Sequence, residues 1–218
     1  MAWFHVLAHV ALPCAIAAAA GFGAWRAWRL WRIAPDPRLA KLLWFYALFS
    51  LSLVSIAIWT GQLSYDASAG LSHDADVTGG HGEGHSEFVD NQRIDGFLVA
   101  HHVLMLASLG IAVQAFSHKR RSASVALAGL AVLAPLVPVV LAVEAALTLY
   151  LAIVAILNHR ERRSPGALQV AAGFLLFFIG HLSFFIFHNP GVARTPLGDI
   201  FALVGIVLLV RLLPRPTA

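Results

Sequence analysis

Charged residues are scarce in this chain. They make up 12% of its 218 residues, whereas a soluble domain carries roughly 25%. With 59% hydrophobic residues and a mean hydropathy of +0.77, the chain has too little polar surface for a protein surrounded by water. Lipid must therefore supply much of the solvent, and a backbone in lipid satisfies its hydrogen bonds only in helices or in a closed barrel.

Cysteine is almost absent too, since Cys14 is the only one in the sequence. An intrachain disulfide and a thiolate metal cluster are therefore excluded. No lysine lies near the centre of a hydrophobic run, which excludes a retinal Schiff base, and no serine–histidine–aspartate or phosphate-loop pattern occurs. The net charge of +4 is modest and lies between hydrophobic runs, where it is a topology signal and gives no case for nucleic-acid binding.

Long apolar runs are what the chain does have, at residues 42–58, 123–156 and 166–187. They are unbroken and lack the alternation of barrel strands, so they predict helices. We therefore predict an all-α, polytopic transmembrane helix bundle in the cell membrane, forming a single domain over residues 1–218. The N-terminal run lacks the basic start of a signal peptide and predicts a retained first span.

Seven spans are predicted, at residues 3–25, 42–63, 96–116, 122–134, 138–157, 166–188 and 197–213. The ambiguous stretch is 122–158, because it is too long for one span of ~20 residues and short for two. The basic loops on either side of it should both lie in the cytoplasm, which requires two spans between them. Seven spans place the N-terminus outside and the C-terminus inside, whereas one proline-kinked helix over 122–158 gives six spans.

Most histidines fall on one side of this topology. Of eleven histidines, all but His118 and His159 lie in the outer half of the membrane or in the outer loop. Several ionisable side chains share a predicted depth of ~10 Å below the outer surface, at 1.5 Å per helical residue; these are His9, His101, His102, Glu144 and His181. Such residues are costly inside a span and indicate a function, although Glu144 leaves this layer if there are six spans.

Imidazoles and a carboxylate are the ligand set of a transition metal such as zinc, copper, iron or nickel. Spacings of four and seven residues put two pairs of these side chains on shared helix faces, whereas only one of His101 and His102 can point at a given centre. The candidate metal ligands are His5, His9, His101, His102, Glu144, His181 and His188. We predict metal-ion handling or metal-assisted chemistry near the outer face. In a hydrolase, the metal would activate water and Glu144 would act as the general base.

The longest polar segment, residues 64–94, is predicted to be an extracytoplasmic loop rich in histidine, aspartate, glutamate and glycine. Short histidine-rich tracts bind transition metals loosely. His73, His81 and His85 are therefore predicted to capture an ion for the buried site on the same side of the membrane. A solvated acidic loop without metal is the alternative.

Two other functions stay open. A b-type haem electron-transfer subunit needs two imidazoles on facing helices at one depth, and His101 or His102 with His181 meets that need. In a non-catalytic scaffold or complex subunit, the histidines are interfacial anchors, as tryptophan and tyrosine often are. Glu144 is then protonated and hydrogen-bonded within its own helix. The predicted partners are the lipid bilayer and, for these alternatives, other subunits of a membrane complex.

Overall fold

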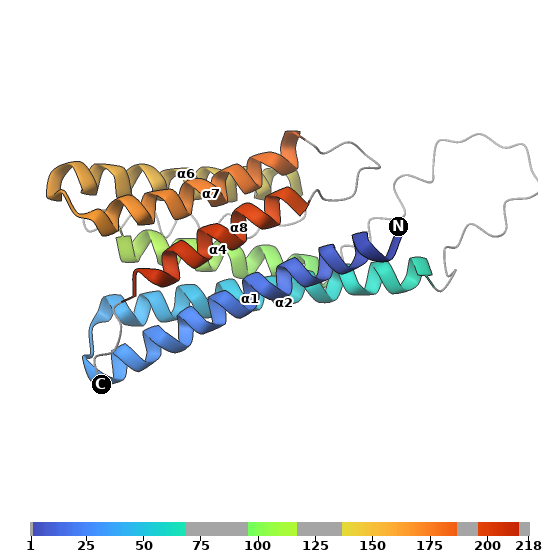
Figure 1. Cartoon of the computed structure of the whole chain (residues 1–218), viewed down its shortest axis with the longest axis horizontal. Helices are drawn as coiled ribbons and strands as arrows, with labels where there is room; N and C mark the ends of the chain where they lie inside the picture. The colour runs from blue at the N-terminus through green and yellow to red at the C-terminus, as the bar shows by residue number, and fades with distance from the viewer. Residues whose placement is uncertain (1, 69–95, 117–136, 187–195, 214–218) are drawn as a thin grey trace, which may run out of the picture.

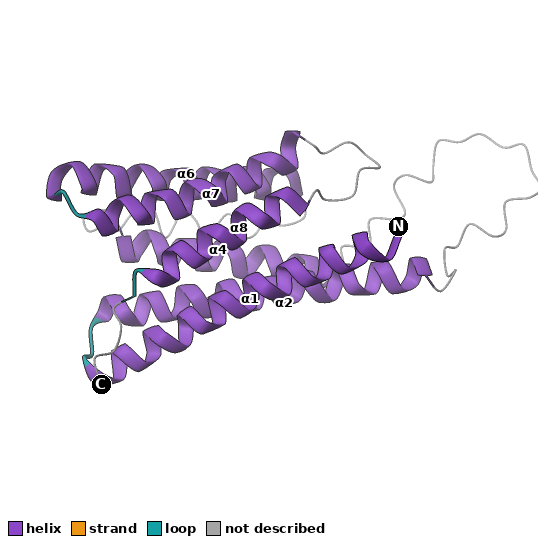
Figure 2. Cartoon of the chain, in the orientation of Figure 1, coloured by secondary structure: helices purple, strands orange, loops and turns teal. Residues whose placement is uncertain are grey.

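The computed structural model describes residues 2–68, 96–116, 137–186 and 196–213, which are helical apart from short turns (Figures 1 and 2). The helices are α1 (Ala2–Ile33), α2 (Pro37–Ser68), α4 (Gly96–Phe116), α6 (Val137–Arg162), α7 (Pro165–Ile186) and α8 (Pro196–Arg211). The predicted all-α fold class is confirmed for these ranges. The predicted span 122–134 and most of the predicted loop 64–94 lie outside them.

Five of these helices contain stretches that are long and apolar enough to cross a membrane: Val10–Ile33, Pro37–Gly61, Gly96–Phe116, Val139–Glu161 and Pro165–Ser183. α8 is also apolar, but its 16 residues are fewer than the ~20 of a typical span. Large apolar side chains such as Leu51 and Leu168 stay more than half exposed (53% and 54%), as a lipid-facing surface requires. The protein is therefore a multi-pass membrane protein.

Three helices extend beyond their predicted ends, and one of them is α6, which continues past residue 157 to Arg162. α1 continues through the arginines that were predicted to follow the first span, and the chain turns only at residues 34–36. Asp36 then caps α2, because its carboxylate accepts a hydrogen bond from Arg38 N at 2.8 Å, and Pro37 occupies the first helical position, where a missing N–H costs nothing. α2 reaches Ser68, so the first residues of the predicted loop 64–94 are helical.

The helices form a closed circuit that follows the order of the chain. α1 packs on α2, α2 on α4, α4 on α6, α6 on α7, α7 on α8, and α8 returns to α1. The α8–α1 contact includes Arg26, whose Nη1 and Nη2 donate to Val210 O at 3.1 Å and to Leu213 O at 2.6 Å. The guanidinium thus ties α1 to the end of α8, where Val210 O also accepts from Leu213 N at 3.2 Å.

α4 and α6 run parallel, which two contacts establish. Near their N-terminal ends, His102 lies against Glu144, and near their C-terminal ends Asn158 Nδ2 donates to Phe116 O at 3.5 Å. Phe116, the last residue of α4, and Val137, the first of α6, therefore lie at opposite ends of the bundle.

Positive charge collects at one end of the bundle, where α1, α4, α6 and α8 end and α2 begins (left in Figure 1). Every lysine and arginine in the described ranges lies there: Arg26, Arg29, Arg32, Arg38, Lys41, Arg160, Arg162, Arg163 and Arg211. We call this the basic end. The opposite end carries the N-termini of α1, α4, α6 and α8.

Candidate functional site

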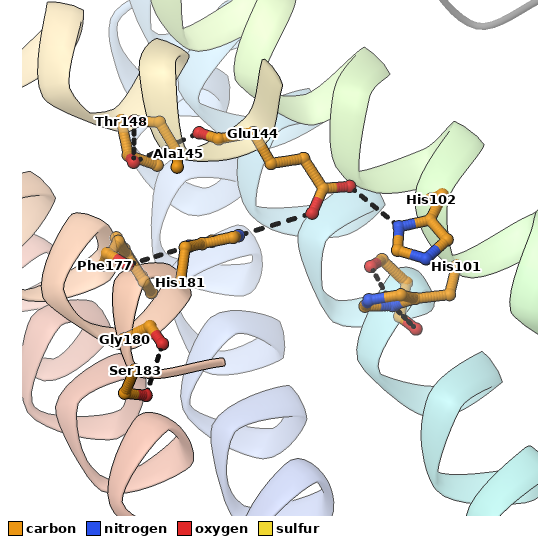
Figure 3. A network of polar contacts seen from close by, with 10 residues as sticks. His101, His102, Glu144, Ala145, Thr148, Phe177, Gly180, His181 and Ser183 are labelled. Atoms are coloured by element: carbon orange, nitrogen blue, oxygen red, sulfur yellow. Dashed lines mark hydrogen bonds and ion pairs between the residues drawn. The ribbon is translucent and has the colours of Figure 1, made fainter. Parts of the chain in front are cut away.

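Three helices bring ionisable side chains into contact away from the basic end (Figure 3). His102 Nδ1 on α4 lies 3.1 Å from Glu144 Oε1 on α6, and His181 Nε2 on α7 lies 3.4 Å from Glu144 Oε2. We call His102, Glu144 and His181 the triad. Each imidazole has its own carboxylate oxygen, so the three side chains form a chain with Glu144 in the middle.

The triad is buried at one depth. Glu144 and His102 are each 1% exposed, and the His181 side chain is 12% exposed. All three residues lie within two turns of the helix end opposite the basic end, or roughly 10 Å at 1.5 Å per residue. Ionisable groups this deep in a membrane protein are costly, and they usually pair with one another as these do.

The contact between His181 and Glu144 requires a proton. His181 Nδ1 lies 2.8 Å from Phe177 O, and a carbonyl oxygen can only accept, so Nδ1 carries a hydrogen. In a neutral imidazole the other nitrogen, Nε2, then has a lone pair. This lone pair would face an ionised carboxylate oxygen at 3.4 Å, which is repulsive. Either His181 is an imidazolium or Glu144 carries the proton on Oε2.

His102 leaves one nitrogen open. Its Nδ1 donates to Glu144 Oε1 at 3.1 Å, so in the neutral ring Nε2 has a lone pair. Nε2 is buried and has no hydrogen-bond partner among the described residues. A buried polar atom without a partner is uncommon and calls for an explanation.

His101 points away from the triad. Its Nδ1 lies 2.9 Å from Ser52 O and 2.8 Å from Ser52 Oγ on α2, and its ring centroid lies 5.0 Å from that of His102. The sequence predicted that only one of the two adjacent histidines would face a common centre, and His102 is the one that faces Glu144. Ser52, which is fully buried, was not predicted, because a serine in an apolar run has no spacing signal.

Glu144 makes its contacts outside its own helix. The scaffold alternative expected the carboxyl to bond within the helix, for example to Thr148. Instead, Thr148 Oγ1 donates to the backbone oxygens of Glu144 and Ala145 at 3.1 and 2.9 Å. The carboxylate is thus left to the two histidines.

The remaining predicted site residues are only partly covered by the structure. His5 and His9 belong to α1, but their side chains are not described, and His73, His81, His85 and His188 lie outside the described ranges. Within those ranges, no group of three or more histidine, cysteine, aspartate or glutamate side chains is arranged to hold a metal ion. The predicted metal and haem ligands therefore stay predictions.

Comparison with known protein families, with characterised proteins and with solved structures gives no match.

Proposed function

We propose that this multi-pass membrane protein binds and transfers a proton at the triad, as part of proton-coupled transport or chemistry. The observation that carries the proposal is the contact between His181 Nε2 and Glu144 Oε2, which is attractive only with a proton in it. Chains of carboxylates and histidines inside membranes commonly serve as proton relays.

The hydrogen-bond pattern supports proton transfer from His102 through Glu144 to His181. A proton that binds the open Nε2 of His102 makes this ring an imidazolium, whose Nδ1 proton can pass to Glu144 Oε1. When the shared proton starts on Glu144 Oε2, it passes to His181 Nε2, so Glu144 keeps one proton on Oε1 and His181 becomes an imidazolium. One positive charge has moved from α4 to α7, and no heavy atom has left its place.

A transition-metal site, predicted from the sequence, is the second candidate, and the open Nε2 of His102 favours it. Metal-bound histidines usually donate their other ring N–H to a carboxylate, as His102 does to Glu144. Zinc, copper, iron or nickel bound at Nε2 would need further donors, for which the sequence predicts His9 on α1. Glu144 would then orient the ligand in place of acting as a general base.

A haem between His102 and His181 is less well supported. An axial imidazole coordinates the iron through the nitrogen that faces it. The nitrogens that face each other here, Nδ1 of His102 and Nε2 of His181, are both occupied by the carboxylate of Glu144. A bis-histidine haem would have to displace this side chain from between the two rings.

We also infer seven spans, with the basic end in the cytoplasm and the N-terminus outside. The parallel directions of α4 and α6 support this count, since one kinked helix after α4 would make them antiparallel. Concentration of positive charge at one end supports the orientation by the positive-inside rule. The triad then lies in the outer half of the membrane.

Infrared difference spectroscopy of the protein in liposomes, between two pH values and in H₂O and D₂O, tests the proton proposal. We expect carboxyl and imidazole bands that change together and shift in D₂O. The Glu144→Gln variant should lose them. The His159→Gln variant is the control, since this histidine lies at the basic end, where its Nδ1 donates to Ser164 O at 2.8 Å.

Three results would overturn the proton proposal. Glu144→Gln spectra identical to those of the unchanged protein would remove Glu144 from the chemistry. Elemental analysis and an absorption spectrum of the same sample provide the other test. Stoichiometric metal that is lost in His102→Ala would favour the metal candidate, and a Soret band would favour haem.

A further inference from the structure

The C-terminal half of α1 carries an exposed row of aromatic and arginine side chains near the basic end. Phe22, Trp25, Trp28 and Trp31 are 52%, 46%, 40% and 39% exposed. Exposed tryptophans in membrane proteins sit at the level of the lipid headgroups. This row therefore marks where the membrane surface crosses α1.

The part of the row that holds Trp25, Arg29 and Arg32 faces outward from the bundle. The opposite side of α1 is buried at Ala20, Gly23 and Ala27, and a Cβ on Gly23 would lie only 2.8 Å from Val210 on α8. Trp31 lies on the same side of α1 as Ala20 and Ala27. At 100° per residue, Trp25 and Arg32 point away from this buried side. The outward side is left to lipid.

Two arginines are held against the indole rings. The guanidinium of Arg29 lies 5.1 Å from the Trp25 ring centroid, and that of Arg32 lies 5.3 Å from the Trp28 ring centroid. Such cation–π contacts orient a guanidinium without neutralising it. No described residue forms a salt bridge with either arginine, whereas Arg26, on the same helix, reaches the carbonyls at the end of α8.

We propose that Arg29 and Arg32, positioned by Trp25 and Trp28, bind the phosphate headgroup of an anionic phospholipid. The charges are complementary, and a guanidinium suits the oxygens of a phosphate. The indoles would lie along the upper acyl chains, where amphipathic rings are favoured. This site is independent of the triad and of the function proposed for it.

Quenching of tryptophan fluorescence by brominated lipids tests this site in a Trp3→Phe/Trp44→Phe/Trp59→Phe background, in which only the tryptophans of the row remain. The full-length protein is reconstituted in mixtures of brominated and unbrominated phosphatidylglycerol and phosphatidylcholine. We expect a preference for phosphatidylglycerol, which the double variant Arg29→Gln/Arg32→Gln should lower by about fivefold for each charge removed. Arg160→Gln/Arg211→Gln is the matched control, since it removes two exposed arginines at the same end.

A loss of preference in the first variant with retention in the control supports the site. An equal loss in both variants would show that only the overall charge of the basic end attracts the lipid, and would overturn the proposal. Retention in both would overturn it as well. An unchanged thermal midpoint verifies that each variant is folded, as expected for substitutions at exposed positions.

Discussion

At the residue scale, the central group is a carboxylate that must satisfy two imidazoles at once. His102 offers it a donor, whereas His181 offers it a lone pair unless a proton intervenes, because the Nδ1 hydrogen of His181 is committed to Phe177 O. The two sides of Glu144 are therefore chemically different, although both partners are histidines. This asymmetry determines which substitutions the site tolerates.

Glu144→Gln should preserve the structure of the site. The amide oxygen accepts from His102 Nδ1 and the amide nitrogen donates to His181 Nε2, so both contacts survive without the shared proton. We expect the unfolding free energy in detergent to stay within about 1 kcal/mol, a typical net hydrogen-bond contribution. Glu144→Leu leaves both buried nitrogens without partners and should cost about 3 kcal/mol or more. Equal losses in the two variants would contradict this account.

The His102→Asn variant distinguishes the roles of the two ring nitrogens of His102. The asparagine amide can replace Nδ1 as the donor to Glu144, but nothing replaces the open Nε2. We expect a fold stabilised almost as in the unchanged protein, and infrared spectra without the coupled carboxyl and imidazole changes. A variant that keeps these changes would show that protons do not reach the triad through His102.

Much of this site could be anticipated from the sequence. Span boundaries and a rise of 1.5 Å per residue place His102, Glu144 and His181 at one depth, and the structure brings the three into contact. The ring nitrogens used, the proton shared with His181 and the role of Ser52 could not be anticipated. They depend on how far each helix is rotated about its axis. Because apolar residues occur on all sides of these spans, the sequence pattern does not predict that rotation.

At the element scale, the backbones of α7 and α8 lie very close together. A Cβ on Gly205 would lie 2.8 Å from Gly173 O, and one on Gly180 would lie 3.0 Å from Gly198 O. Both contacts are to backbone atoms, which cannot rotate away as a side chain can. Glycines thus let the two helix backbones touch, as small residues do in membrane bundles.

Gly205→Ala should therefore push α7 and α8 apart, at a cost of about 1–3 kcal/mol from overpacking. Gly110→Ala is the matched control, because a Cβ there meets no atom within 4 Å. The control should be neutral or should stabilise α4 by roughly 0.5–1 kcal/mol through helix propensity. Thermal unfolding in detergent compares the two, and a Gly205→Ala protein as stable as the control would refute the close approach.

Helix boundaries were anticipated best where a turn signal stands next to the apolar run. The predicted span 96–116 has the bounds of α4, Gly96–Phe116. The prediction for α1 was short because the arginines after residue 25 were taken as its end. These arginines stack along the helix on aromatic rings instead, so positive charge and helical structure coexist up to Ile33.

At the scale of the whole molecule, the number of spans determines on which side of the membrane each turn lies. Ala34 lies in the α1–α2 turn, and Ser164 lies in the α6–α7 turn. Both turns belong to the basic end. With seven spans they face the same compartment, whereas with six they face opposite compartments.

Labelling with a membrane-impermeant maleimide distinguishes these topologies. Cys14 is replaced by serine, and single cysteines are placed at Ala34, Ser164 or Ser68, the last residue of α2. In intact cells we expect only Ser68→Cys to react, and the other two to react after permeabilisation. If only one of Ala34→Cys and Ser164→Cys reacts in intact cells, the protein has six spans. If both react, the orientation is the reverse of the one inferred here.

The hydrogen bonds from Arg26 to the end of α8 can form only late in biosynthesis. Its partner Leu213 comes 187 residues later in the chain, or about 10–40 s at 5–20 residues per second. Until the last helix inserts, the sides of α1 and α7 that pack on α8 lack this partner. A chain that stalls before Pro196 thus leaves these two helix surfaces without α8, and Arg26 without the two carbonyls to which it donates in the complete bundle.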